Sequence, residues 1–179
     1  MKMVLMGNAG AGKSTLAKRL MGDRAIALLP LDDIAWNANV QRKPLADSVA
    51  LLNTFIEQHE DWMIEGCYGD LLAAALPHCE QLLFLNPGVA ACVAHCYQRP
   101  WEPDKFSSPE AQQTMLEPLI DWVKTYETRT DEFGLQCHRQ LFETFTGDKH
   151  EYRSVAAYPH DWQQPPDAPA HPVPESTPL

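Results

Sequence analysis

Short apolar runs alternate with longer amphipathic stretches along most of the chain. The apolar runs are typical of strands buried on both faces of a parallel sheet. They predict strands at about 2–6, 25–31, 62–64, 81–85 and 150–155. The amphipathic stretches repeat apolar residues with the helical period and predict helices at 13–21, 47–60, 71–76, 89–97, from 109 onward, and at 131–145. This alternation predicts an α/β fold: a three-layer α/β/α sandwich with a five-stranded, mainly parallel sheet.

Prolines divide the chain into three parts. Seven of the 15 prolines lie at or after Pro159, in a segment without a long apolar pattern. We therefore expect one packed domain over 1–156 and a mobile, Pro-rich tail over 157–179. A second proline-bearing stretch, at about 98–110, interrupts the helical pattern and is expected to form a small lid.

The chain is acidic, with 14 Lys and Arg residues against 24 Asp and Glu residues, a net charge of −10. This balance argues against a general nucleic-acid binder and against docking on an anionic membrane by charge. No apolar run approaches the roughly 18–20 residues of a membrane span, and the first residues do not form a signal-peptide core. The five cysteines form no metal-type double pair, so we expect reduced thiols and a cytoplasmic protein.

One motif carries specific chemistry. Residues 7–14, GNAGAGKS, match G-x-x-x-x-G-K-[ST] between an apolar strand and an amphipathic helix. In such a loop, backbone N–H groups and the helix N-terminus bind phosphates, the lysine reaches the β- and γ-phosphates, and the serine hydroxyl binds Mg²⁺. ATP is the expected nucleotide, because no guanine-specific Asn/Thr-Lys-x-Asp stretch is present. The nucleotide-binding residues are predicted to be Gly7, Asn8, Ala9, Gly10, Ala11, Gly12, Lys13, Ser14 and Thr15.

The chain resembles the small P-loop kinases of the shikimate, gluconate, adenylate and nucleoside kinase type. Within this group it looks most like the proteins described as adenylate- or shikimate-kinase-like, or as topology-modulation proteins. The resemblance covers about residues 1–155 and rests on GNAGAGKST at 7–15, LDDIAW at 31–36, WMIEGCYG at 62–69, LLFLN at 82–86 and Arg-Pro at 99–100. It implies a P-loop NTPase fold and an ATP- and Mg²⁺-dependent kinase.

Two carboxylates follow the second predicted strand, at the sheet edge where doubly wound folds bind ligands. By likeness to sugar and nucleoside kinases, Asp32 is our first candidate for the base or acceptor ligand. Asp33 is the second candidate and could hold Mg²⁺ through water. The alternative is that both are helix-capping carboxylates.

Three further residues are predicted to bind substrate. Glu65 and Tyr68 follow the third strand, where adenylate kinases carry a similar acidic-Gly-aromatic stretch, so Glu65 would face Mg²⁺ or the acceptor. Trp36 and Tyr68, together with Trp101 of the lid, could stack on the acceptor or bind a cation. The alternative for Glu65 is a solvated loop carboxylate.

Arg99 is expected to act from the lid. Shikimate kinases have an Arg-Pro pair at a similar place, where the guanidinium stabilises charge on the transferring phosphoryl group. The alternative is a surface arginine at the end of a helix, and Lys105 is a weaker candidate in the same loop. The fourth strand ends at Asn86 rather than at an acidic residue, so the Mg²⁺-organising carboxylate must be Asp32, Asp33 or Glu65.

The distribution of positive charge bears on the acceptor. Residues 44–98 contain no Lys or Arg, although this region forms much of the acceptor site in nucleotide and shikimate kinases. A neutral or cationic hydroxyl compound therefore fits better than an anionic one. The leading hypothesis is transfer of the ATP γ-phosphoryl group to a small hydroxyl-bearing metabolite. The alternative is a nucleotide-binding regulatory or ATPase module that acts on a protein partner through the Pro-rich tail.

Overall fold

A parallel sheet organises the computed structural model, which describes residues 1–39, 41–103 and 106–161. Five strands of this part pair in the order β2-β3-β1-β4-β5, and every pair is parallel. The strands are β1 (Lys2–Gly7), β2 (Ala27–Pro30), β3 (Trp62–Gly66), β4 (Gln81–Leu85) and β5 (Asp148–Tyr152). The predicted α/β class and five-stranded sheet are confirmed. Strand β1 lies in the middle, so the loop after it opens at the centre of the sheet edge.

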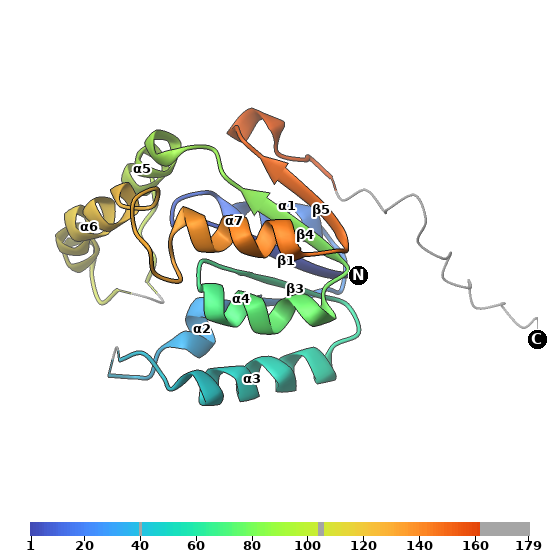
Figure 1. The fold of residues 1–179 in the computed structure, drawn as a ribbon. Coiled ribbons are helices and arrows are strands. Elements are labelled where there is room, and N and C mark those ends of the chain that lie inside the picture. Colours follow the sequence, from blue (N-terminus) through green and yellow to red (C-terminus); the bar gives the residue numbers. More distant parts are fainter. Residues whose placement is uncertain (40, 104–105, 162–179) are drawn as a thin grey trace, which may run out of the picture.

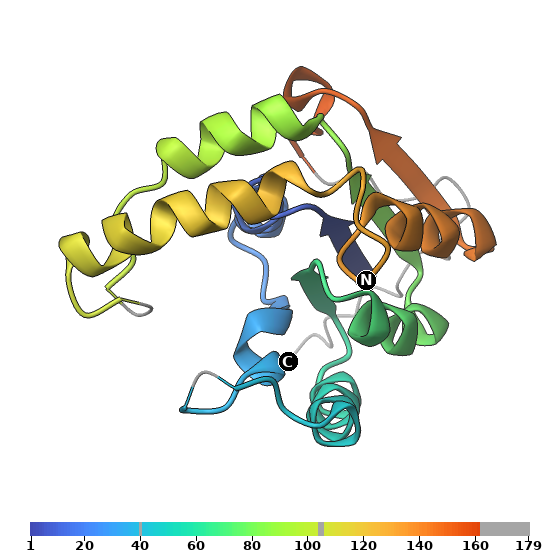
Figure 2. The same ribbon diagram turned by 60° about the vertical axis from the view of Figure 1, so that its left-hand side comes forward.

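Helices and two 3-10 turns connect the strands. The helices are α1 (Lys13–Met21), α2 (Leu31–Ala35), α3 (Leu45–Gln58), α4 (Gly69–Ala75), α5 (Val89–Tyr97), α6 (Pro109–Lys124) and α7 (Leu135–Thr144). The 3-10 turns are η1 (Leu76–His78) and η2 (Val155–Ala157). Figure 1 shows α3, α4 and α7 over one face of the sheet and α1 behind it. Figure 2 shows α5 and α6 running side by side, joined at their outer end by the predicted lid segment.

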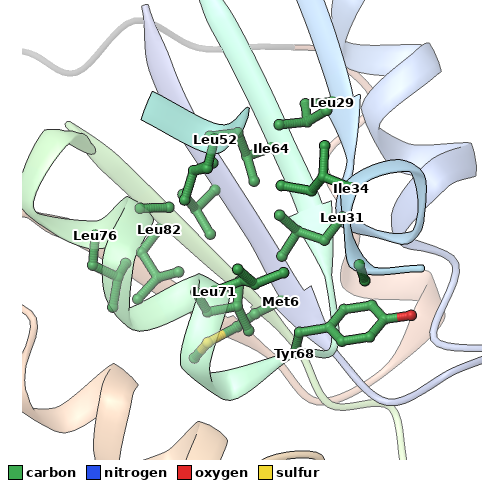
Figure 3. Packing of buried hydrophobic residues seen from close by; sticks show 14 of the residues in the cluster. Met6, Leu29, Leu31, Ile34, Leu52, Ile64, Tyr68, Leu71, Leu76 and Leu82 are labelled. Carbon is green, nitrogen blue, oxygen red and sulfur yellow. The ribbon is translucent and has the colours of Figure 1, made fainter. Parts of the chain in front are cut away.

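The two faces of the sheet form two separate cores, as expected for strands that are apolar on both sides. In β1, Val4 and Met6 pack toward α2, α3, α4 and α7, whereas Met3 and Leu5 pack toward α1, α5 and α6. Figure 3 shows the first of these cores, with Tyr68 at its edge and the phenol oxygen pointing away from the apolar side chains. Burial of the strands on both faces gives the carboxyl edge of the sheet a rigid base.

Several element boundaries differ from those predicted. Strand β2 ends at Pro30, and residues 31–35 form α2, so the two aspartates lie in the first turn of a helix rather than at a strand end. Helix α7 begins at Leu135, because Asp131 accepts a hydrogen bond from the backbone N–H of Phe133 and forms a turn there. Strand β5 starts two residues earlier than predicted, since its register follows Gln81 of β4.

The packed part of the chain extends past the predicted domain boundary at 156. Tyr158 is buried and packs in the same core as α1, α5 and α6. The remainder of the predicted tail, 162–179, lies outside the described residues, as does Lys105. Across the described ranges, no helix is both long enough and apolar enough to cross a membrane. All five cysteines are free, and Cys92 and Cys96 are buried.

Candidate functional site

The loop between β1 and α1 follows a path that requires glycine. Gly10 has a φ of 77°, and a Cβ at this position would lie 2.3 Å from the carbonyl oxygen of Cys92 in α5. Gly12 has a φ of 89° and immediately precedes α1. Both values lie in the left-handed region that side chains disfavour. The loop therefore packs tightly against α5 and leads into a helix N-terminus whose first N–H groups have no partner within the helix.

Three side chains, two of them from segments distant in the sequence, hold the carbonyl groups of this loop. The Tyr158 hydroxyl donates to the carbonyl oxygen of Ala11 at 2.8 Å, and Lys13 Nζ donates to that of Asn8 at 2.8 Å. His95 Nδ1 lies 2.7 Å from the carbonyl oxygen of Gly10, so its proton must be on Nδ1, because a carbonyl group only accepts. These contacts fix the orientation of three peptide units, as a preorganised phosphate cradle needs.

Ser14 and Glu65 meet between two neighbouring strands. Strand β3 pairs with β1, so its carboxyl end places Glu65 beside the start of α1. Ser14 Oγ donates to Glu65 Oε1 at 2.6 Å, and Glu65 is only 7% exposed. The alternative interpretation of Glu65 as a solvated loop carboxylate is wrong, because the side chain is buried.

Asp32, Tyr68 and Trp36 form a hydrogen-bonded chain. Trp36 Nε1 donates to the Tyr68 hydroxyl at 2.7 Å, and this hydroxyl donates to Asp32 Oδ1 at 2.5 Å. Burial and the negative charge of Asp32 raise the pKa of Tyr68, so its phenol stays protonated and acts as the donor. Three of the predicted acceptor-site residues are thus linked directly.

One cleft of about 930 Å³ brings most of the predicted residues together. Its lining includes Ala9, Gly10, Gly12, Lys13, Ser14, Thr15, Asp32, Trp36, Glu65, Tyr68 and Arg99. Gly7, Asn8 and Ala11, which were also predicted to bind nucleotide, do not line it. Arg99 is held near the cleft by a 3.5 Å ion pair with Glu102.

Asp33 is not brought into the cleft. Successive residues of a helix point about 100° apart, and in α2 it is Asp32 that lines the cleft whereas Asp33 does not. The structure therefore separates two carboxylates that the sequence treated as near equivalents.

Asn86 follows β4 where an acidic residue would be expected, but the carboxylate of Glu151, from the neighbouring strand β5, lies beside it. Asn86 Nδ2 donates to Glu151 Oε1 at 3.0 Å, and Glu151 pairs with Arg139 at 2.7 Å and with Arg153 at 3.0 Å. These bonds, mainly those from Arg139, lower the pKa of Glu151 to about 2. Glu151 is committed to this network and does not line the cleft, whereas Asp32, Glu65 and Glu102 do, the last of them paired with Arg99.

Several cleft residues were not predicted from the sequence. Trp122 from α6, Phe133 from the turn before α7, and Val155 and Tyr158 from the C-terminal segment all line the cleft, as does His95 from α5. No motif marks these residues, and Tyr158 fell in the predicted tail. Only the packing of α6 and of the C-terminal segment against the phosphate loop brings them there.

Cys67 also lines the cleft but is not a nucleophile at neutral pH. Burial raises the pKa of its thiol to about 11, and the nearby charge of Lys13 offsets this only in part. The neutral thiol is a weak nucleophile. Within the described ranges, no group of three or more His, Cys, Asp or Glu side chains could by itself hold a metal ion.

No protein-family model matches this chain, and no curated protein matches it in sequence. Its fold is similar to that of small P-loop kinases of known structure. Shikimate kinase from Acinetobacter baumannii, in complex with shikimate, is 18% identical with a TM-score of 0.43, over 78% of this chain and 89% of that one. Deoxyadenosine kinase from M. mycoides, with bound dATP, is 9% identical with a TM-score of 0.47, over 86% and 91% of the two chains.

A gluconokinase from Sinorhizobium meliloti 1021 is similar in the same way. It is 17% identical with a TM-score of 0.40, over 78% of this chain and 93% of that one. At sequence identities this low, the similarity concerns the fold alone.

Proposed function

We propose that this protein is a kinase that transfers the γ-phosphoryl group of ATP to a hydroxyl group of a small metabolite. The observation that supports this most strongly is the composition of one cleft. It combines a glycine-rich loop with Lys13, a Ser14–Glu65 pair, the Asp32 carboxylate and the Arg99 guanidinium. Phosphoryl transfer needs little beyond positioning and charge stabilisation, and these groups supply both.

The phosphate side of the cleft would hold the triphosphate. The N–H groups at the start of α1 and the Lys13 ammonium bind the phosphate oxygens, with the glycine loop in its fixed conformation. Arg99 contributes a planar, permanently charged group that can contact two oxygens of the transferring phosphoryl group. We propose residues 98–110 as the lid. Gln112 of α6 anchors its described part, because the Gln112 side chain bonds the backbone of Pro100 and Glu102.

The residues around Ser14 fit a magnesium site. Mg²⁺ prefers oxygen ligands and usually takes only one or two from the protein, together with phosphate oxygens and waters. Ser14 Oγ and Glu65 Oε1, 2.6 Å apart, offer two such oxygens beside the helix that binds phosphate. When bound there, Mg²⁺ would supply positive charge to the phosphate oxygens.

Asp32 would accept the proton of the acceptor hydroxyl. As that proton moves to the carboxylate, the acceptor oxygen bonds to the γ-phosphorus, the bond from this phosphorus to the bridging oxygen breaks, and ADP leaves. Tyr68 holds one carboxylate oxygen of Asp32 in place. This bond fixes the orientation of the carboxylate.

The first experiment measures ADP formation with and without pools of hydroxyl metabolites. Stimulation by one metabolite, together with a phosphorylated product, is expected. Lys13→Ala should abolish this turnover and keep the circular dichroism spectrum, whereas Lys124→Ala, an exposed lysine of α6 paired only with Asp121, should keep both. Slow hydrolysis that no metabolite stimulates would favour the regulatory or ATPase module instead, and turnover in Lys13→Ala would refute the assignment.

The two neighbouring aspartates of α2 provide a matched test of the base. Asp32→Asn is expected to lower kcat about 100-fold or more, because it removes the proton acceptor. Asp33→Asn makes the same chemical change one residue away, outside the cleft, and should leave kcat within about twofold. Equal losses in the two variants would exclude this role for Asp32.

A further inference from the structure

Four aromatic side chains form a continuous surface along one side of the cleft. This aromatic wall consists of Trp36, Tyr68, Trp122 and Phe133, which all line the cleft. Trp36 contacts Tyr68 through a 2.7 Å hydrogen bond, and the rings of Tyr68 and Phe133 meet edge to face at 5.3 Å. The rings of Phe133 and Trp122 also meet edge to face, at 5.6 Å. Aromatic faces carry negative potential, so such a wall attracts cations.

Two arginine side chains of the protein make cation–π contacts with these rings. The Arg42 guanidinium carbon lies 4.9 Å from the centre of the Tyr68 ring. That of Arg129 lies 4.4 Å from the centre of the Trp122 ring and 5.4 Å from that of Phe133. Neither arginine lines the cleft, whereas the three rings do.

Carboxylates balance both of these arginines. Arg42 pairs with Asp70 at 3.0 Å, and Arg129 pairs with Asp131 at 2.6 Å. The hydrogen bonds that Arg129 donates hold the pKa of Asp131 below its usual range, so this pair stays ionised and neutral overall. The two arginines consequently add no net positive charge behind the wall.

Charge is divided between the two sides of the cleft. Of the described lining residues, the cationic or titratable basic ones lie on or directly after α1 and α5: Lys13, Lys18, Arg19, His95 and Arg99. The lining carboxylate next to the aromatic wall is Asp32, which the Tyr68 hydroxyl contacts. Glu65 bonds Ser14 at the start of α1, and Glu102 pairs with Arg99. An anionic acceptor at the wall would meet Asp32, whereas none of the basic lining residues comes from the segments that form the wall.

We propose that the phosphoryl acceptor is a small amino alcohol, a hydroxyl compound that also carries a protonated or quaternary ammonium group. The ammonium group lies against the aromatic wall and the hydroxyl group reaches Asp32. This inference rests on the proposed kinase function and adds the chemical class of its substrate. The product is then ADP together with a phosphate monoester that retains the ammonium group.

The test compares probes that differ in charge, in a binding assay that needs no turnover. Choline, its uncharged isostere 3,3-dimethylbutan-1-ol, the anion glycerate and an aminocyclitol are titrated into the full chain by calorimetry, with and without a non-hydrolysable ATP analogue. At least one amino alcohol should bind, and choline should bind about tenfold or more tightly than its isostere. Isostere or glycerate binding as tight as choline binding would overturn the proposal, as would the failure of every amino alcohol to bind.

Two exposed tryptophans supply a matched pair of variants. Trp36 lines the cleft and is 40% exposed, whereas Trp101 does not line it and is 49% exposed. Trp36→Leu should weaken binding of the amino alcohol roughly 2- to 30-fold, the range of a cation–π contact, and should leave isostere binding unchanged. Trp101→Leu should change neither. An unchanged affinity in Trp36→Leu would contradict a cation site on the wall.

The failure of this proposal is distinguishable from failure of the kinase function. ATP-dependent phosphorylation of neutral or anionic alcohols only would retain the kinase and remove the amino alcohol. Choline binding without a phosphorylated product from any alcohol tested, whether amino, neutral or anionic, would retain the cation site and remove the kinase.

Discussion

The Tyr68 hydroxyl is a small group on which the geometry of the acceptor side depends. It accepts from Trp36 at 2.7 Å and donates to Asp32 at 2.5 Å. The Tyr68 side chain is 4% exposed, so Tyr68→Phe keeps the packed ring and removes only the oxygen. We expect this variant to fold and to lose the fixed orientation of the Asp32 carboxylate.

The size of the effect follows from the bonds removed. A hydrogen bond to a charged group contributes about 1.5–3 kcal/mol. If all of this free energy serves to orient the Asp32 carboxylate for catalysis, the loss of the bond lowers kcat about 10- to 150-fold. The free energy of unfolding should fall by about 1–3 kcal/mol, because two partly buried hydrogen bonds beside the cleft are lost. The KM for ATP should stay the same, since Tyr68 lies on the acceptor side.

Tyr126→Phe provides the control. Tyr126 is 3% exposed, its hydroxyl lies 2.8 Å from His138 Nδ1, and it does not line the cleft. Removing this hydroxyl leaves a buried ring nitrogen without its partner, so the free energy of unfolding should fall by a similar amount, about 1–3 kcal/mol.

The assay measures kcat and KM with the acceptor found in the metabolite screen, and stability by denaturant titration. The reasoning would be refuted if Tyr68→Phe kept kcat within twofold of the parent. It would also be refuted if Tyr126→Phe lost as much kcat as Tyr68→Phe, because both losses would then follow from stability alone.

Three further predictions concern the phosphate loop and the turn before α7. Gly10→Ala should lower the thermal midpoint and weaken ATP-analogue binding, because its Cβ would lie 2.3 Å from the Cys92 carbonyl oxygen; unchanged binding would contradict this. Tyr158→Phe should weaken ATP-analogue binding about 2- to 10-fold in calorimetry, since it removes the bond to Ala11 and loosens the loop. Burial and the neighbouring Asp70 raise the pKa of Glu132 from 4.5 to about 7, so stability should fall as pH rises from 4.5 to 7, where only the unfolded carboxyl has lost its proton. Denaturant titrations across this range should show a smaller fall for Glu132→Gln.

Much of the fold could be predicted from the sequence, because its strands are apolar on both faces. A buried parallel strand reads as a short continuous apolar run, and 81–85 and the helix 89–97 were located to the residue. Helix α2 was missed, since five residues show too little of the helical period for its pattern to be seen. Strand β5 was the least distinct, because its residues are polar and its position depends on pairing with β4.

The phosphate loop could be identified because its chemistry is local. The backbone path from Gly7 to Ser14 needs glycines at set places, so the residues that bind phosphate are neighbours in the chain. The residues proposed to bind the acceptor, by contrast, are not neighbours in the chain. Its residues come from α2, β3, α6 and the turn before α7, and their contribution depends on which direction each side chain points.

The sequence by itself determined the class of fold, the position of the proposed phosphate-binding loop and the scarcity of positive charge around the expected acceptor. Tertiary structure alone decided that Asp32 rather than Asp33 enters the cleft, because one step along a helix turns a side chain by about 100°. It also brought Trp122 and Phe133 beside Tyr68, and Tyr158 onto the phosphate loop. These contacts join segments far apart in the chain, and the packing of two separate cores, rather than any local pattern, sets them.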